Sequence, residues 1–209
     1  MKTVIGSHAI TLGSVEGSQV EGLFSPGEKA HILYSDPPWG EGNMKYWATM
    51  AEKMTGSRPN QMTFDGMLDR FGELIRGFCT GFVFVEQGMR FEEQTVGALQ
   101  KAGVTVSRIV QIRYGSGKNT LPNILICGSV NGQTPTLPEG VEGMKGAKLP
   151  YEVVKCNALP GGIVLDPCCG MGYTAKAAVR NNMIFRGNEF NSARLAKTEK
   201  FLRSKVKVA

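Results

Sequence analysis

The sequence Asp36-Pro37-Pro38-Trp39 directly follows a mostly apolar run at residues 30–35. Prolines cannot donate to a sheet ladder, and an aspartate at the end of a buried strand is not a packing residue. The Asp36 carboxylate and the Pro37 carbonyl could together accept both N–H bonds of one amine, while the proline pair fixes that carbonyl. The Trp39 indole offers a flat face for a stacked ring. The alternative is an ordinary polar turn after a strand.

A second apolar strand ends in Asp166 and runs into a turn that contains Gly170 and Gly172. Glycines at such a turn let the backbone approach a ligand closely, although this pattern is neither the GxGxxG fingerprint nor a P-loop. Glu189 ends the next strand, where an acid could accept hydrogen bonds from two ribose hydroxyls. With Asp166 as partner for an ammonium group, these residues favour S-adenosylmethionine over NAD. The alternative is a glycine turn that only joins a strand to a helix.

The elements that must position these residues alternate between strands and helices. Residues 62–79 have the clearest helical spacing of apolar side chains, with Thr63 as the expected N-cap, and Ser192 is the expected cap of the closing helix. The strands at 106–114 and 122–130 predict an antiparallel pair at an edge of the sheet. The pattern predicts an α/β fold with a doubly wound, mostly parallel sheet.

Length and composition predict a single domain over residues 1–209. No apolar stretch approaches the 18 or more residues that a membrane span needs, and no signal peptide is evident, so we expect a cytoplasmic protein. The five cysteines lack zinc spacing, which predicts reduced thiols and no metal site.

The net charge of +6 is concentrated near the C-terminus, where residues 194–209 hold six basic side chains and one acidic one. A basic chain is typical of nucleic-acid-binding proteins, but cations also suit the end of a helix. Arg113 and Lys118 lie in a stretch without acids and are either phosphate contacts or part of a solvated hairpin. Glu86, at the end of a strand, lies either on the surface or at the rim of the site.

The two glycine- and proline-marked stretches together resemble the motifs of the amino-methyltransferases, which methylate exocyclic nitrogens of nucleic-acid bases. Their catalytic motif, [DNS]PP[YFW], is matched in full by residues 36–39. Their cofactor motif, similar to DPFxGxG followed by TxxAA, is matched by residues 166–178, except that Cys168 stands in place of phenylalanine. A Lys-Pro element is matched more loosely, because Leu149 separates Lys148 from its proline. The catalytic motif comes first, which is the permuted order of many adenine-N6 enzymes.

The resemblance implies a Rossmann-like sheet of seven mostly parallel strands with an antiparallel edge strand. It places the Asp36 and Asp166 strands side by side. The catalytic residues that it implies are Asp36, Pro37, Pro38 and Trp39. The residues that it implies for S-adenosylmethionine are Asp166, Pro167, Cys168, Gly170, Gly172, Glu189 and Lys148. The expected substrate contacts are Trp39, Lys45, Trp47, Arg113 and Lys118.

The resemblance implies a DNA N6-adenine methyltransferase, because aspartate rather than serine at position 36 favours adenine over cytosine-N4. An RNA adenine methyltransferase is one alternative. A non-catalytic cofactor-binding or nucleic-acid-binding subunit of a larger complex is another. The candidate substrate-contacting insertions are short, at residues 41–61 and 131–148, and no separate recognition domain is evident. We therefore expect a relaxed or short target, or recognition supplied by a homodimer or a partner subunit.

Overall fold

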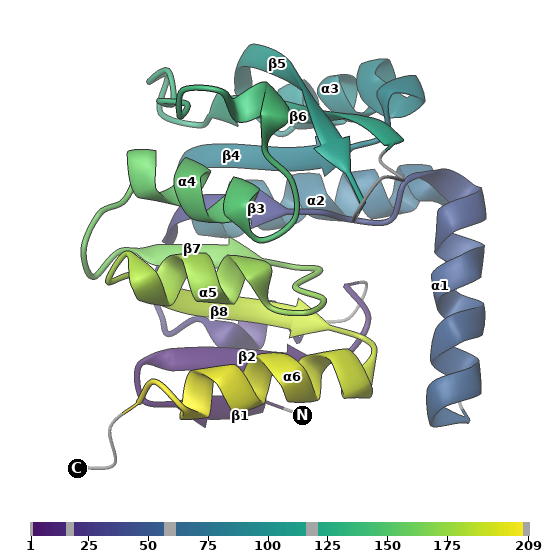
Figure 1. Ribbon diagram of the computed structural model, residues 1–209, viewed down its shortest axis with the longest axis vertical. Helices are drawn as coiled ribbons and strands as arrows, with labels where there is room; N and C mark the ends of the chain where they lie inside the picture. Colours follow the sequence, from purple (N-terminus) through teal and green to yellow (C-terminus); the bar gives the residue numbers. More distant parts are fainter. Residues whose placement is uncertain (1, 16–18, 57–61, 116–120, 207–209) are drawn as a thin grey trace.

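The computed structural model describes residues 2–15, 19–56, 62–115 and 121–206. Within these residues, eight strands form one sheet in the order β1-β2-β8-β7-β3-β4-β6-β5 (Figure 1). The strands are β1 (Lys2–Ile5), β2 (His8–Leu12), β3 (Ala30–Ser35), β4 (Cys79–Gln87), β5 (Thr105–Tyr114), β6 (Leu121–Ser129), β7 (Ile163–Asp166) and β8 (Ile184–Glu189). No helix in the described segments is long and apolar enough to cross a membrane.

Five neighbouring strands, β2, β8, β7, β3 and β4, run parallel. The predicted antiparallel pair is confirmed, because β5 and β6 form the edge beyond β4. β6 is also antiparallel to β4, so β5 runs in the same direction as β4. At this end of the sheet, the strand that runs against the others is therefore β6, one position inside the edge, and not an edge strand as expected. The expected number of seven strands is wrong. Residues 2–12 turn back on themselves as a hairpin, and β1 adds an antiparallel strand at the opposite edge.

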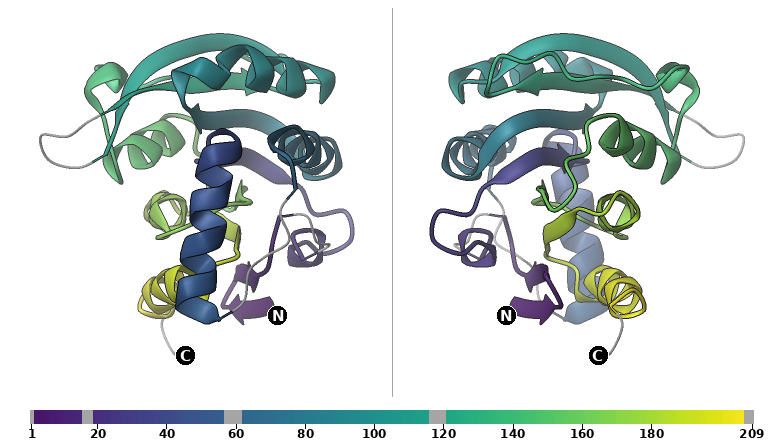
Figure 2. Two further views of the ribbon diagram at one scale, coloured as in Figure 1. Left: turned by 90° about the vertical axis from the view of Figure 1, so that its right-hand side faces the viewer. Right: turned by 90° about the vertical axis from the view of Figure 1, so that its left-hand side faces the viewer.

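The helices are α1 (Gly40–Thr55), α2 (Phe64–Phe78), α3 (Glu92–Lys101), α4 (Lys148–Cys156), α5 (Tyr173–Arg180) and α6 (Ser192–Arg203). Figure 2 shows α4, α5 and α6 on one side of the sheet and α2 on the other. Parallel strands with helices on both faces are buried on both faces, so their sequences are almost continuously apolar. In β3, Ile32 belongs to the core under α4 and α5, and Leu33 to the core under α2 and α3.

The helix starts show how far local sequence fixes a boundary. Thr63 is the N-cap of α2 as predicted, and its hydroxyl accepts a hydrogen bond from the Gly66 N–H at 3.1 Å. Ser192 is not the cap of α6. The carboxamide oxygen of Asn191 accepts from the N–H groups of Ala193 and Arg194 at 3.1 and 3.2 Å. Asparagine and serine are equally good caps, so their order in the sequence could not decide between them.

Helix α1 was not predicted, because residues 41–61 show no clear apolar period. It stands apart from the two helical layers, at the carboxyl ends of the parallel strands (Figure 1). Its Ala48 and Ala51 are buried, whereas Tyr46 is 54% exposed. The helix is therefore an outlying wall at the edge of the sheet where ligands of open α/β sheets bind.

Candidate active site

Three acidic side chains meet at the carboxyl ends of three adjacent strands. Asp36 follows β3, Asp166 ends β7, and Glu86 lies near the end of β4. Asp166 and Glu86 are buried, at 3% and 8% exposure, and Asp36 is half-buried. All three line one cavity of about 340 Å³, which we call the deep cavity. Its wall also contains Gly170, Thr174 and other residues of the glycine turn.

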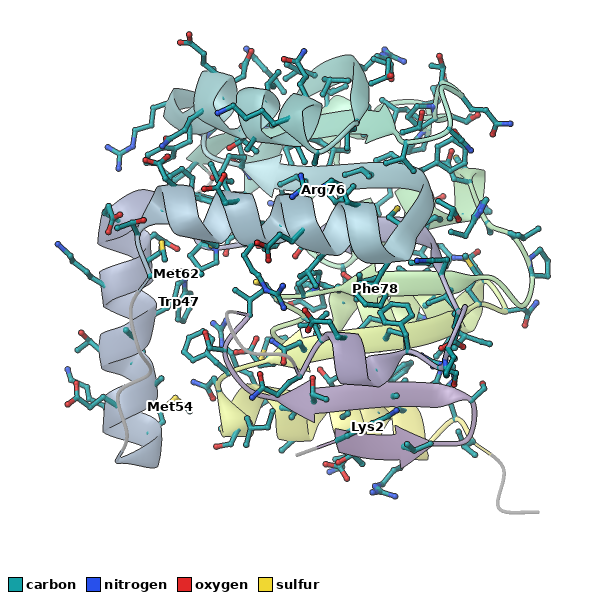
Figure 3. The ribbon with its side chains drawn as sticks, turned by 180° about the vertical axis from the view of Figure 1, so that it is seen from behind. Lys2, Trp47, Met54, Met62, Arg76 and Phe78 are labelled. Atoms are coloured by element: carbon teal, nitrogen blue, oxygen red, sulfur yellow. The ribbon has the colours of Figure 1, made fainter. Side chains whose placement is uncertain are left out.

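A second cavity of about 130 Å³ lies between the sheet edge and α1, and we call it the α1 cleft. Its lining includes Trp39, Met44, Trp47 and Met67, so it is largely apolar and aromatic. In Figure 3, Trp47 and Met54 project from α1 toward the body of the molecule. The two cavities share four lining residues, Asp36, Tyr114, Cys168 and Arg194. Asp36 therefore lies where the deep cavity and the α1 cleft meet.

The Asp36 carboxyl group is fixed by the aromatic residue of its own motif. The indole Nε1–H of Trp39 donates to Asp36 Oδ1 at 3.1 Å. Burial, together with repulsion from the Asp166 carboxyl, raises the pKa of Asp36 to about 7, while the Trp39 hydrogen bond and the Arg194 charge oppose the shift. Asp36 therefore exchanges its proton near neutral pH and can act as an acceptor there.

The Asp166 carboxyl group is held by hydrogen bonds from the neighbouring strand β3 and from the glycine turn. Its Oδ1 accepts from the Ser35 hydroxyl at 2.8 Å and from the Cys168 N–H at 3.0 Å. Burial raises the pKa of Asp166 to about 6, against the opposing effect of hydrogen bonds from Thr174, Ser35 and the Cys168 backbone. Both motifs thus help to orient Asp166 toward the deep cavity, because Ser35 directly precedes Asp36 and Cys168 lies in the glycine turn.

The glycine turn is built around the Glu189 carboxylate. Glu189 accepts from the Gly170 N–H at 2.8 Å through Oε2 and from the Asn191 N–H at 2.8 Å through Oε1. Gly172 has a φ of 75°, and a Cβ there would lie 2.5 Å from Thr198 Oγ1 on α6. Only glycine fits such a position, so the turn presents bare backbone beside a fixed acid.

Trp39 is held edge-on by Tyr114 rather than lying on a free face. The two rings have centroids 4.4 Å apart and planes inclined by 71°. Tyr114 ends β5, and burial raises its pKa to about 12, with Asp36 and Glu86 contributing. Tyr114 thus completes an aromatic wall beside Asp36.

Arg194 brings a positive charge to both cavities. Its guanidinium lies 3.8 Å from the centroid of the Trp47 ring, which clamps the first turn of α6 against α1. Stacking of this kind is favourable and orients the cation. The Arg194 charge also opposes the rise in the pKa of both Asp36 and Glu189, so it stabilises their ionised forms.

Solved structures of other proteins share the fold of this chain. The S-adenosylmethionine complex of M1.HpyAVI superposes with a TM-score of 0.67 at 14% identity, covering 92% of this chain and 98% of that one. TTHA0409 of Thermus thermophilus, assigned as a DNA modification methylase, has a TM-score of 0.66 at 17% identity, with 97% of each chain covered. The PvuII cytosine-N4-specific DNA methyltransferase has a TM-score of 0.65 at 11% identity, covering 97% of this chain and 88% of its own. The chain has the fold of DNA methyltransferases.

Neither a protein-family model nor a curated protein matches the sequence, so the likeness is one of fold. Within this methyltransferase fold, the predicted residues that line a cavity are Asp36, Pro37, Pro38, Trp39, Trp47, Asp166, Pro167, Cys168, Gly170 and Glu189. Their predicted roles stay predictions. Within the described segments, no group of His, Cys, Asp or Glu is arranged to hold a metal ion.

Four predicted contacts do not line the two cavities. Lys45, Arg113 and Lys148 are exposed, and their side chains form no part of either cavity wall, whereas Gly172 acts through the shape of the glycine turn. From the segment around Lys148, Gly146 and Pro150 line the deep cavity instead. The roles of the two lysines and of Arg113 as cofactor or substrate contacts stay predictions.

The predicted contact Lys118 lies outside the described residues. Sequence reasoning missed Tyr114 and Arg194 as site residues. It did not decide whether Glu86 lies on the surface or at the rim of the site. Glu86 lies at the rim, as a buried residue of the deep cavity wall. Tyr114 ends a strand beside the site, which is a signal that the sequence contains. Arg194 was counted as part of a basic tail, and nothing local distinguishes it from Lys197.

The raised pKa of Asp36 predicts a pH effect on stability. In an unfolded chain Asp36 titrates near 3.9, whereas its pKa in the fold is about 7. The stability that its protonated form contributes is complete below the unfolded value and is lost as the pH rises through the folded value. We therefore expect the Tm of Asp36→Asn minus that of the wild type to grow between pH 5 and pH 8, by about 5 °C or more. Calorimetry of the cofactor-free proteins would measure it, and a constant difference would contradict a buried, titrating Asp36.

Proposed function

We propose that this protein transfers the methyl group of S-adenosylmethionine to the exocyclic N6 of adenine in DNA, at a short or relaxed target. The observation that carries the proposal is the convergence of Asp36 and Asp166 from adjacent parallel strands onto one cavity. Structures with this fold include M1.HpyAVI and TTHA0409 in complexes with S-adenosylmethionine, which supports the choice of cofactor. The order of the motifs along the chain, with Asp36 before Asp166, supports the permuted type.

The residues around the glycine turn fit the cofactor. Glu189 has both oxygens fixed by backbone N–H groups, and each oxygen keeps a lone pair for a ribose hydroxyl. Gly170 and Gly172 leave the backbone bare beside it. Asp166 faces the deep cavity as a partner for an ammonium group. When bound there, the cofactor supplies a methyl group activated by a sulfonium charge.

The Trp39 and Trp47 side of the α1 cleft is the proposed place of the target base, and the Glu189 side of the same cleft is the proposed place of the cofactor ribose. An exocyclic amine on adenine is a poor nucleophile, because its lone pair is delocalised into the ring. Asp36 in its ionised form accepts one N–H bond, and the Pro37 carbonyl accepts the other, which aims the nitrogen lone pair into the deep cavity. Trp39 and Trp47 provide aromatic surface for a flat ring. A base in duplex DNA has to be flipped out to reach this place.

The form of α1 supports the proposal of a short or relaxed target. Of the predicted insertion at residues 41–61, the structure describes residues 41–56, and nearly all of these belong to α1. It contributes the wall of the α1 cleft rather than a separate unit. Longer targets would need contacts beyond those of α1, such as those of a second copy or of a partner subunit.

The experiment that tests the proposed substrate is transfer of radiolabelled methyl from S-adenosylmethionine to DNA and to RNA of the same sequence. We expect the label in DNA, and competition by unlabelled DNA but not by RNA should remove it. A preference for RNA would replace DNA as the substrate. Binding of the cofactor without transfer to either polymer would favour a non-catalytic subunit.

A further inference from the structure

The deep cavity holds more acids than cations. Asp36, Glu86 and Asp166 line it from three adjacent strands, β3, β4 and β7. Among the described residues of its wall, Arg194 is the only arginine, lysine or histidine. Asp36 and Asp166 already have roles in the proposed function, as amine acceptor and ammonium partner. Glu86 has no role in it, although burying a carboxyl group costs folding free energy.

Glu86 is held at the cavity wall by a buried tyrosine. The Tyr34 hydroxyl donates to Glu86 Oε1 at 2.8 Å, and Tyr34 is 1% exposed. Tyr34 precedes Asp36 by two residues on the same stretch of chain, so both side chains lie on the same face of the sheet. Burial, followed by repulsion from Asp36, raises the pKa of Glu86 well above its usual range. Burial thus favours the protonated form of Glu86, and a cation that enters the cavity would favour the ionised form.

The other titratable groups of the wall do not supply this charge. They are Tyr34, Tyr114, Tyr173, Cys168 and Cys169. Tyrosine and cysteine side chains are neutral near pH 7 unless something lowers their pKa. Burial instead raises the pKa of both cysteine thiols, of Tyr34 and of Tyr114. The carboxyl groups are thus the ones that can change charge when a ligand enters.

We propose that Glu86 is a specificity-determining residue that matches the sulfonium charge of S-adenosylmethionine, so that the site prefers the charged cofactor to the neutral thioether product. This inference rests on the proposed function and deepens it. S-adenosylmethionine and S-adenosylhomocysteine differ by one methyl group and one positive charge. A carboxylate in the cavity wall distinguishes them by that charge, and Tyr34 positions the carboxylate.

The charge balance of the reaction fits this role. As the methyl group moves, the S–C electron pair stays on sulfur, and the amine lone pair forms the new N–C bond. The nitrogen then loses one proton, which Asp36 accepts. The sulfonium charge has disappeared at the same time, so the pair of Asp36 and Glu86 holds one proton more than before. Glu86 therefore loses a proton when the charged cofactor binds and can regain one, through Asp36, after transfer.

The test compares the affinities of S-adenosylmethionine and S-adenosylhomocysteine for the wild type, Glu86→Gln and Tyr34→Phe by isothermal titration calorimetry. Glu86→Gln should weaken S-adenosylmethionine by about tenfold and leave S-adenosylhomocysteine within about twofold. Tyr34→Phe should shift the affinity ratio in the same direction by less. The exposed Glu139→Gln is the matched control, and it should bind both ligands as the wild type does.

A second readout separates a charge effect from a loss of shape. Titrations at pH 7 in two buffers of different ionisation enthalpy measure the protons released on binding. The wild type should release more protons with S-adenosylmethionine than with S-adenosylhomocysteine, and Glu86→Gln should reduce that excess. Equal weakening of both ligands, or an unchanged proton excess, would overturn the proposal. If Glu86→Gln does not fold, an unchanged affinity ratio in Tyr34→Phe overturns it. Failure of the folded wild type to bind either ligand would instead overturn the proposed function on which it rests.

Discussion

Replacing Asp36 by asparagine should lower the rate of methyl transfer by about 10³-fold or more and leave binding of S-adenosylmethionine within a few-fold. The asparagine would keep the shape of the side chain but lose its charge. Because the Trp39 indole already donates to one oxygen of Asp36, the carboxamide would accept there and turn its NH₂ group toward the target amine. Two donors would then face each other, and the amine would lose the acceptor that orients it.

The matched control for this substitution is Asp69→Asn, an exposed aspartate on α2 that lines neither cavity. Single-turnover transfer of radiolabelled methyl measures the chemical step, and calorimetry measures the cofactor affinity. Transfer by Asp36→Asn at the rate of Asp69→Asn would contradict a catalytic role for Asp36.

Replacing Gly172 by alanine should destabilise the fold by about 2–3 kcal/mol and weaken cofactor binding by more than about tenfold. The φ of 75° at Gly172 is strained for alanine, and the added Cβ would lie 2.5 Å from Thr198 Oγ1. Relief of that contact moves the turn away from α6. The backbone at Gly170 and its hydrogen bond to Glu189 then shift with it.

Gly143→Ala is the matched control, because a Cβ there meets nothing within 4 Å and the backbone does not have a positive φ. It should change the free energy of unfolding by no more than about 0.5 kcal/mol. Urea unfolding of both variants measures the difference. A Gly172→Ala variant as stable as Gly143→Ala would show that the turn tolerates a side chain and would contradict the tight approach of α6.

The parts of this fold that follow from local physics could be predicted from the sequence. Apolar runs ending in Asp36 and Asp166 predict strands whose carboxyl ends carry acids, and the sheet brings those ends together. The helical period at residues 62–79 and the Thr63 cap predict α2 because both signals lie within a few turns of chain.

The remainder depends on contacts between distant segments. α1 has little apolar period, since much of its inner face borders the α1 cleft rather than a packed core. Arg194 is set apart from the other basic residues of its helix by the Trp47 ring, which lies far away in sequence. The hairpin that adds an eighth strand requires a tight turn at Gly6, which has a φ of 58°. The sequence of residues 4–13 predicts either a short strand or a hairpin, so it could not decide the number of strands.

The most direct test of the central claim is mass spectrometry of nucleosides after incubation of DNA with the protein and S-adenosylmethionine that carries a deuterated methyl group. The proposed site predicts labelled N6-methyldeoxyadenosine with the wild type and about 10³-fold less with Asp36→Asn at the same early time point. Label on N4 of deoxycytidine would contradict the assignment to adenine. No labelled nucleoside from a wild type that binds the cofactor, or equal label from both proteins, would contradict the site itself.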